Sequence, residues 1–195
     1  MTKLERLAEE ARACRICAPQ LPLGPRPAFR VSATARLLIV GQAPGRLVHE
    51  TGLSWNDRSG DRLRDWLGLD RETFYDQRRI GLLGMGLCYP GVDKHGGDRP
   101  PRPECAPRWQ RRFIALMPRI ELILLVGGYA QNFHLERARR GNVTETVARW
   151  REHLPDYIAL PHPSWRNTAW LKRHPWFESE LLPELRRRVA GIVGV

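Results

Sequence analysis

The 195-residue chain is predicted to be an α/β protein, a three-layer α/β/α sandwich around a four-stranded, mainly parallel sheet. Short aliphatic runs, the pattern of strands buried on both faces, alternate with segments of helical periodicity. Each aliphatic run also opens into an unusual loop rich in glycine, proline or histidine. Because parallel strands end at one edge of a sheet, we expect these four loops to converge on a single cleft.

The first half of the chain carries the signals of two strands and two amphipathic helices. Strands are predicted over residues 37–40 and 80–87. Helices are predicted over residues 3–13 and from an N-cap at Ser59 to a stop at Gly68. The segment 18–34 contains four prolines and is expected to cross the surface in an extended conformation.

The second half continues the alternation. Strands are predicted over residues 121–126 and 157–160. Helices are predicted over residues 108–117, after Gly127-Gly128, and over 144–153 and 178–190. Residues 89–107 are rich in proline and glycine and are expected to form a connection. The arginine run 186–188 is expected to be a solvated helix face.

Length and charge limit the possible classes of protein. No linker divides the sequence, so a single domain spanning residues 1–195 is expected. The formal net charge of +11 favours a polyanionic partner such as nucleic acid. No apolar run reaches the roughly 18 residues that span a bilayer. The charged N-terminal segment lacks the apolar core of a signal peptide, and we expect a cytoplasmic protein that does not bind membranes.

Four cysteines form a potential ligand set. Cys14 and Cys17 lie in a CxxC pair, and Cys88 and Cys105 follow beside turn-forming sequence. A cytoplasmic location disfavours disulfides, so metal or cluster ligation is the main alternative to buried free thiols. The spacing by itself leaves zinc, an iron–sulfur cluster and unrelated thiols open.

Three segments resemble motifs of the uracil-DNA glycosylase superfamily, especially its iron–sulfur branches, families 4 and 5. The loop 41–45, GQAPG, is similar to the first motif, which is GEAPG in family 4 and GLAPG or similar in family 5. Residues 51–60, TGLSWNDRSG, resemble the family 4 stretch that carries a base-stacking aromatic residue, and 162–168, HPSWRNT, resembles the last-loop motif. The resemblance covers nearly the whole chain and implies the superfamily fold and a 4Fe-4S cluster. Its ligands would be Cys14, Cys17, Cys88 and Cys105.

The resemblance also implies catalytic roles. His162 would hydrogen-bond the uracil O2 and stabilise the leaving base anion. Family 4 uses a glutamate at the position of Gln42, and glutamine can orient water but cannot accept its proton. Asp57 resembles the aspartate that family 5 carries just after its aromatic segment, and the resemblance implies that it orients the water and stabilises the cationic sugar, with Gln42 assisting. The alternative is that Asp57 only stabilises a turn or caps a helix.

Substrate binding is expected from the same motifs. Relatives commonly read uracil with an asparagine at the end of the second strand, where this chain has Gly84 and Met85. Asn56 or backbone groups would have to replace it, and action on other deaminated bases such as hypoxanthine or xanthine is expected to be less restricted. Trp165 and Arg166 could probe the minor groove while Ser164 binds phosphate. The full set of expected substrate-binding residues is Gly41, Ala43, Trp55, Asn56, Ser164, Trp165, Arg166 and Asn167.

Together these features predict a monofunctional DNA glycosylase. It would act as a monomer on DNA containing uracil or another deaminated base and would leave an abasic site. Two alternatives remain open from the sequence. One is a non-catalytic or weakly catalytic DNA-binding member of the same fold, and the other is a zinc-stabilised protein that acts on nucleotides or RNA.

Overall fold

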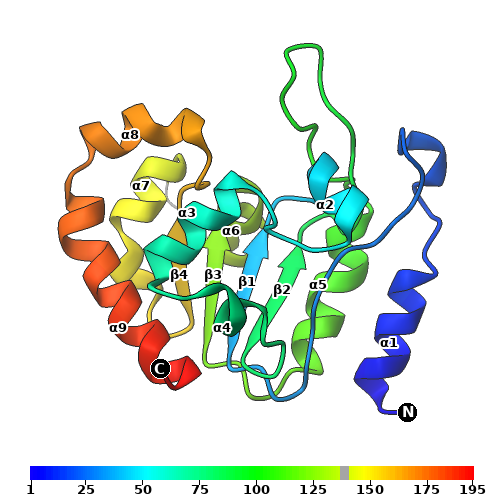
Figure 1. The fold of residues 1–195 in the computed structure, drawn as a ribbon, viewed down its shortest axis with the longest axis horizontal. Helices are drawn as coiled ribbons and strands as arrows, with labels where there is room; N and C mark the ends of the chain where they lie inside the picture. The colour runs from blue at the N-terminus through cyan, green and yellow to red at the C-terminus, as the bar shows by residue number, and fades with distance from the viewer. Residues whose placement is uncertain (137–140) are drawn as a thin grey trace.

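The computed structural model describes residues 1–136 and 141–195 and has three layers, with helices on both faces of one sheet (Figure 1). This confirms the predicted α/β/α sandwich. The strands are β1 (Leu37–Gly41), β2 (Ile80–Gly84), β3 (Leu122–Val126) and β4 (Tyr157–Leu160). The helices are α1 (Lys3–Arg12), α2 (Arg46–Thr51), α3 (Arg58–Leu67), α4 (Arg71–Tyr75), α5 (Cys105–Ala115), α6 (Gly128–Leu135), α7 (Val143–Ala148), α8 (Thr168–Arg173) and α9 (Leu182–Val193).

The sheet is parallel throughout, with the strand order β2-β1-β3-β4. In register, Leu37 of β1 lies between Ile80 of β2 and Leu122 of β3. From β1 the chain continues to β2 on one side of β1, and then crosses back to β3 and β4 on the other side. Such a reversal opens a crevice at the carboxyl ends of the strands, and ligands bind there in open α/β sheets.

Alternate side chains of each strand enter two separate cores. Leu37 and Ile39 pack in one core with α3 and α9, whereas Leu38 and Val40 pack in the other with α1, α5 and α6. This period of two follows from the pleat of a strand, and burial of both faces explains the unbroken aliphatic runs. Within the described part of the chain, no helix combines the length and apolar character that crossing a membrane requires.

Several predicted boundaries were wrong. Strand β2 ends at Gly84 instead of Leu87, because the chain then bends so that the N–H groups of Met85 and Gly86 bond to the loop after β1. Helix α5 begins at Cys105, so this thiol lies in the first helical turn and not in a loop.

Two helices also differ in how they start or end. The cap of α3 is Asp57 and not Ser59, which lies one residue inside the helix. The segment predicted as one helix over 144–153 is α7 followed by a short 3₁₀ helix, and α9 is preceded by a π-helical turn at Phe177–Leu181. The short helices α2, α4 and α8 have too few turns to produce a clear periodic signal.

The connection between β2 and α5 contains a projecting hairpin, which we call the 91–99 hairpin. It is the green loop that extends beyond the ends of the strands (Figure 1). The N–H of Arg99 bonds to the carbonyl of Gly91, and Asp93 caps the tip by accepting from the N–H groups of His95 and Gly97. Val92 and Asp98 pair across the hairpin. The chain therefore returns at Asp98 toward the ends of the strands.

Candidate active site

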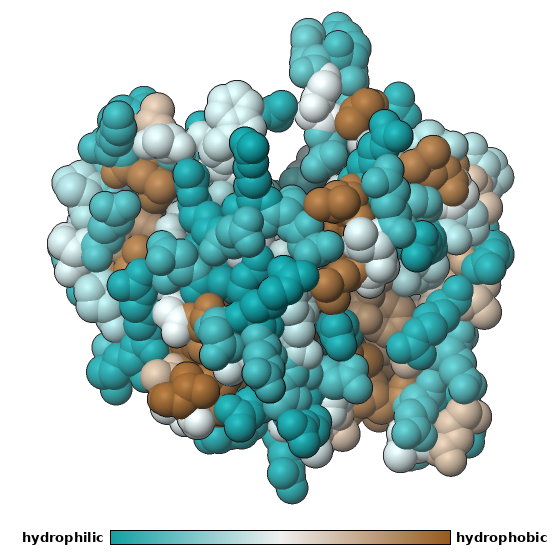
Figure 2. Space-filling model, viewed as in Figure 1, coloured by the Kyte–Doolittle hydropathy of each residue, from teal (hydrophilic) through white to brown (hydrophobic). Residues whose placement is uncertain are grey.

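A cavity of about 630 Å³ lies at the carboxyl ends of the strands, within the size range of small-molecule sites. The molecule is hollowed beside the base of the 91–99 hairpin, and the surface of this face is mainly hydrophilic (Figure 2). Most of the lining residues lie in five segments, within 41–44, 54–59, 83–84, 96–98 and 162–167, and Ala28 and Val48 complete the lining. Segments that are distant in sequence thus converge, as predicted, although the loop after β3 supplies no lining residue.

The indole of Trp55 forms one wall of the cavity. It lies directly over Gly41, where an added Cβ would come within 2.7 Å of the ring. The centroids of the Trp55 and His162 rings are 5.8 Å apart. Trp55 has a φ of +59°, a left-handed conformation that is uncommon for a non-glycine residue and costs backbone strain. The absence of a side chain at Gly41 is what allows the aromatic wall to approach the end of β1.

A buried network holds Trp55 in this conformation. Arg64, only 7% exposed, donates to the Trp55 carbonyl at 3.2 Å, and the Tyr75 hydroxyl donates to the Ser54 carbonyl at 2.9 Å. Gly60 completes the fit, because a Cβ there would lie 1.7 Å from the Trp55 carbonyl oxygen. Strain of this kind persists only where the surroundings hold it, and here the surroundings are specific and buried.

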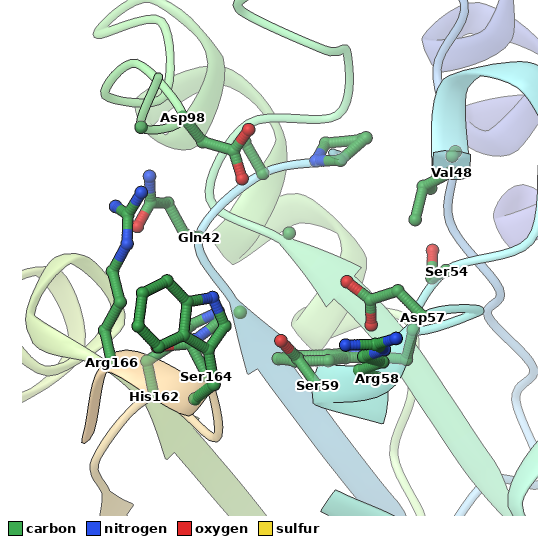
Figure 3. Close-up of a pocket in the computed structure, with 18 of the residues that line it drawn as sticks. Gln42, Val48, Ser54, Asp57, Arg58, Ser59, Asp98, His162, Ser164 and Arg166 are labelled. Carbon is green, nitrogen blue, oxygen red and sulfur yellow. The ribbon is translucent and has the colours of Figure 1, made fainter. Parts of the chain in front are cut away.

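The two oxygens of the Asp57 carboxylate have different surroundings. One carboxylate oxygen accepts a 2.8 Å hydrogen bond from the Gly60 N–H and caps α3. The other oxygen has no hydrogen bond to any described residue, and the carboxylate faces the cavity (Figure 3). Asp57 therefore does cap the helix, and capping leaves the outer oxygen available for a substrate or water.

His162 follows β4 and faces the cavity beside Trp55. Burial lowers the pKa of the His162 imidazole, and the Asp57 carboxylate partly opposes this effect. The ring is therefore neutral at pH 7 and carries one N–H donor. Asn167 shapes the same loop, since its amide donates to the His162 carbonyl at 2.7 Å.

The loop after β4 also forms the rim of the cavity. Trp165 is 73% exposed, and the Arg166 guanidinium lies 5.8 Å from the centre of its ring. Arg62 of α3 donates to the Ser164 carbonyl at 3.0 Å and so ties the rim to the helix that begins at Asp57. An aromatic side chain this exposed has little role in the core, which suits it to contact a partner.

The predicted catalytic and substrate-binding residues line one cavity, with the exception of Asn56. The residues brought together are Gly41, Gln42, Ala43, Trp55, Asp57, His162, Ser164, Trp165, Arg166 and Asn167. Asn56 does not line it, because its side-chain oxygen accepts a hydrogen bond from Arg71 at 2.7 Å. At the end of β2, Gly84 lines the cavity without a side chain and Met85 is buried.

Sequence reasoning missed Asp98, which also lines the cavity. It lies in the 91–99 hairpin, which the proline and glycine content had marked only as a connection. The Gly-Gly-Asp sequence indicates a tight turn, but nothing local shows that the chain returns to the cleft there.

The comparison with known families agrees with this architecture. The family model of the uracil DNA glycosylase superfamily matches residues 29–186. The chain belongs to the uracil DNA glycosylase superfamily. All five lining segments fall inside the matched range. The chain is also similar to a solution structure from Methanosarcina acetivorans, a protein provisionally named a uracil DNA glycosylase, with 16% identity, a TM-score of 0.48 and coverage of 82% of this chain and 96% of that one.

The four cysteines of this superfamily member lie near one another, outside the cavity lining. Burial raises the pKa of Cys88 to about 11 and that of Cys105 to about 12, and the neighbouring Cys14 and Cys17 add to both shifts. The Leu87 N–H donates to the Cys105 sulfur at 3.3 Å. The thiols, from the N-terminal arm, the segment after β2 and the start of α5, therefore share one region.

Cysteine thiolates are ligands of two kinds of metal centre. Within residues 1–136 and 141–195, no three His, Cys, Asp or Glu side chains are grouped so that they could hold one metal ion. A zinc site needs all its sulfurs about 2.3 Å from a single ion. In a 4Fe-4S cluster each thiolate binds a different iron, so the ligands lie farther apart, and N–H donors to sulfur are common. Four thiols are the ligand set of a 4Fe-4S cluster and also that of a structural zinc site.

Proposed function

We propose that this protein is a monofunctional DNA glycosylase that hydrolyses the N-glycosidic bond of uracil or another deaminated base in DNA and leaves an abasic site. The observation that carries the proposal is one cavity in which Trp55, Asp57 and His162 face one another, in a member of the uracil DNA glycosylase superfamily. The net charge of +11 supports a phosphate-rich partner.

Each of these side chains has a part in the proposed reaction. Breaking the bond leaves positive charge on the sugar and negative charge on the base. The Asp57 carboxylate would stabilise the sugar cation and orient the attacking water. The neutral His162 would donate its N–H to the departing base, and Trp55 would stack on the base once it is flipped out of the duplex.

The rim would engage the DNA itself. Trp165 would enter the base stack at the flipped site, while Arg166, Ser164 and Asn167 would lie beside the backbone. Since no side-chain amide at the end of β2 reads the base, we propose that uracil is not the only base accepted. The enzyme would act as a cytoplasmic monomer.

We also propose a structural 4Fe-4S cluster held by Cys14, Cys17, Cys88 and Cys105. Three observations support the cluster: the thiols are soft ligands, they are partly buried, and the Leu87 N–H donates to the Cys105 sulfur. When bound, the cluster would join the N-terminal arm to α5 and take no part in bond cleavage. Anaerobically purified protein is expected to be brown and to contain iron and acid-labile sulfide in equal amounts; a colourless protein with stoichiometric zinc would reject the cluster.

The activity is tested with an incision panel. Wild-type protein is mixed in excess with duplexes that contain uracil, hypoxanthine, xanthine or only normal bases, and alkali-labile sites are counted over time. We expect abasic sites in one or more of the deaminated duplexes and none in the normal duplex. The Asp57→Asn variant is expected to lower the single-turnover rate about 100-fold or more.

Asparagine is the right replacement because it caps helices as well as aspartate does. Asp57→Asn therefore removes the negative charge while keeping the bond from Gly60, whereas Asp57→Ala would also remove the cap. A rate equal to that of wild type in Asp57→Asn would show that this carboxylate serves only α3.

A second candidate function is DNA binding without efficient cleavage. Gln42 at the glutamate position of the first motif and Gly84 with Met85 at the end of β2 favour it. This alternative predicts tight binding to the damaged duplexes with no abasic sites, so the same panel separates the two.

A further inference from the structure

The 91–99 hairpin brings a second carboxylate into the cavity. Asp98 lines the cavity, and its side chain points inward from the side opposite Asp57 (Figure 3). Its carboxylate lies over the GQAPG loop, since a Cβ added at Gly45 would be 3.8 Å from an oxygen of Asp98. The Asp98 carboxylate has no hydrogen bond to any other side chain or N–H group among the described residues, so nothing in the fold uses it.

Gln42 explains how the hairpin is held in this place. Its side-chain amide donates to the carbonyl of Arg99, the residue next to Asp98, at 3.2 Å. A glutamate at this position would be ionised at pH 7, and an ionised carboxylate has no proton to donate to a carbonyl. The Gln42 amide can therefore make a hydrogen bond that a glutamate could not. Gln42 replaces the family 4 glutamate and at the same time holds the 91–99 hairpin, which carries the Asp98 carboxylate.

The surroundings of Asp98 suit a group that exchanges protons. Burial raises the pKa of the Asp98 carboxyl, the nearby Asp57 and Asp93 raise it further, and Arg166 opposes them. Asp57 differs, because one of its oxygens is held by the Gly60 N–H, whereas no described N–H or side chain bonds to the Asp98 carboxylate. Two carboxylates with different surroundings in one site commonly divide the roles of base and charge stabiliser. The charged and titratable groups around Asp98 are Asp57 and Arg58 of α3, Asp93 and Arg99 of the hairpin, and His162 and Arg166 after β4.

We propose that Asp98 is a second catalytic carboxylate of this site, the general base that takes the proton of the attacking water, while Asp57 stabilises the cationic sugar. This inference rests on the proposed glycosylase function and assigns the role that the family 4 glutamate would have.

Hydrolysis begins with attack of the water on the sugar. The water oxygen forms a bond to C1′ of the sugar as the C1′–N bond breaks, and the electron pair of that bond leaves with the base. One water proton passes to the Asp98 carboxylate. His162 donates a hydrogen bond to the base anion, which is then protonated from solvent, and Asp98 releases its proton to solvent.

The test compares Asp98→Asn with wild type in single-turnover cleavage of uracil-containing duplex between pH 5 and 9, with enzyme in saturating excess. We expect a rate loss of about 100-fold or more, with DNA affinity unchanged or tighter because a negative charge is removed. We also expect the wild-type rate to fall as the pH drops through the Asp98 pKa, and this acidic decline to be lost in the variant. A structural role would not remove the decline.

Asp93→Asn is the matched control. It removes a negative charge from the same hairpin, but asparagine can still accept the N–H bonds of the turn, so the rate is expected to stay within about threefold of wild type. The folding of each variant is checked by its thermal midpoint, and Asp98→Ser serves if Asp98→Asn does not fold.

The outcomes separate the two proposals. If wild type cleaves and Asp98→Asn cleaves equally fast with the same pH profile, Asp98 is not the base and the glycosylase function stands. A large rate loss that keeps the acidic decline also overturns the assignment. If wild type cleaves none of the damaged duplexes, the proposed function fails and the role of Asp98 fails with it.

Discussion

The wall and the rim of the cavity are built in opposite ways. The wall is Trp55 with its supports Gly60, Arg64 and Tyr75, and every one of these contacts is a close approach or a partly buried hydrogen bond. The rim is the 91–99 hairpin and the exposed Trp165, which stand away from both hydrophobic cores. A base pocket gains from fixed geometry because preorganised groups need no rearrangement during the reaction. A surface that opens a DNA duplex instead needs exposed side chains that can insert between the bases.

This contrast predicts that changes in the wall disturb folding and chemistry together, whereas a change at Trp165 disturbs only the engagement of DNA. The two carboxylates differ in another way. Loss of Asp98 is expected to slow cleavage without weakening DNA binding, because the hairpin carries it into the cavity, whereas Asp57 is also tied to the first turn of α3.

The largest effect is expected from Gly60→Ala. The new Cβ would lie 1.7 Å from the Trp55 carbonyl oxygen, which is backbone and cannot rotate away. Either the turn at Trp55 or the start of α3 must move. We expect a loss of about 3 kcal/mol or more in the free energy of unfolding, measured with urea, and no detectable cleavage.

Gly191→Ala is the control for Gly60→Ala. Gly191 lies in α9, and a Cβ there meets nothing within 4 Å. Alanine is the better helix former by about 1 kcal/mol, so this variant is expected to be slightly more stable than wild type and fully active. If both variants were equally stable, the close packing behind Trp55 would not matter.

The segment that contains Trp55 and Gly60 shows which features of the site can be predicted from the sequence. The TGLSWNDRSG segment predicted an aromatic wall next to a helix start, and the structure places Trp55 at the cavity and begins α3 at Arg58. Helical periodicity was sufficient for the existence of α3 and aliphatic runs for the four strands, although the cap is Asp57 and not Ser59 and β2 ends at Gly84 and not Leu87. The aromatic wall was expected from the family resemblance. The left-handed backbone of Trp55 was not predictable, because it results from contacts with Arg64 and Tyr75 that form only after the helices pack.

Asp98 was unpredictable for a related reason. The alternation of strands and helices indicated that the loops after the strands converge, but a proline-rich connection of about 20 residues has no periodicity that shows where it turns back. Its path depends on long-range bonds such as that from Gln42 to the Arg99 carbonyl. Conversely, Asn56 was expected at the base from its place beside Trp55, but its partner Arg71 lies 15 residues away and holds it outside the cavity.

An intermediate effect is expected from Trp165→Ala. The side chain is 73% exposed, so the free energy of unfolding should change by no more than about 0.5 kcal/mol. Stacking of an aromatic ring on a base contributes about 1–3 kcal/mol, so cleavage of a uracil duplex should slow about 10-fold or more. Single-stranded uracil DNA needs no wedge and should be cleaved at nearly the wild-type rate. An equal loss on both substrates would show that Trp165 acts in the pocket and not on the duplex.

The smallest effect is expected from Arg62→Met, which tests the link between wall and rim. Arg62 donates to the Ser164 carbonyl at 3.0 Å and to the Thr168 hydroxyl at 3.4 Å, on either side of Trp165. Methionine keeps much of the apolar stem but has no donor, so the loop should loosen while Trp55 stays in place. We expect about a fivefold rise in the enzyme concentration that gives half the maximal single-turnover rate on duplex DNA, with the maximal rate unchanged.

The double variant Arg62→Met, Trp165→Ala shows whether the hydrogen bonds of Arg62 act by positioning Trp165. If it does, adding Arg62→Met to Trp165→Ala should cause little further loss, since the two changes remove parts of one interaction. Arg187→Met in α9 controls for the loss of a positive charge, because this arginine pairs with Glu184 on a helix outside the cavity lining. Additive effects of Arg62→Met and Trp165→Ala would instead show that Arg62 contributes to DNA binding by its charge, and that wall and rim work independently.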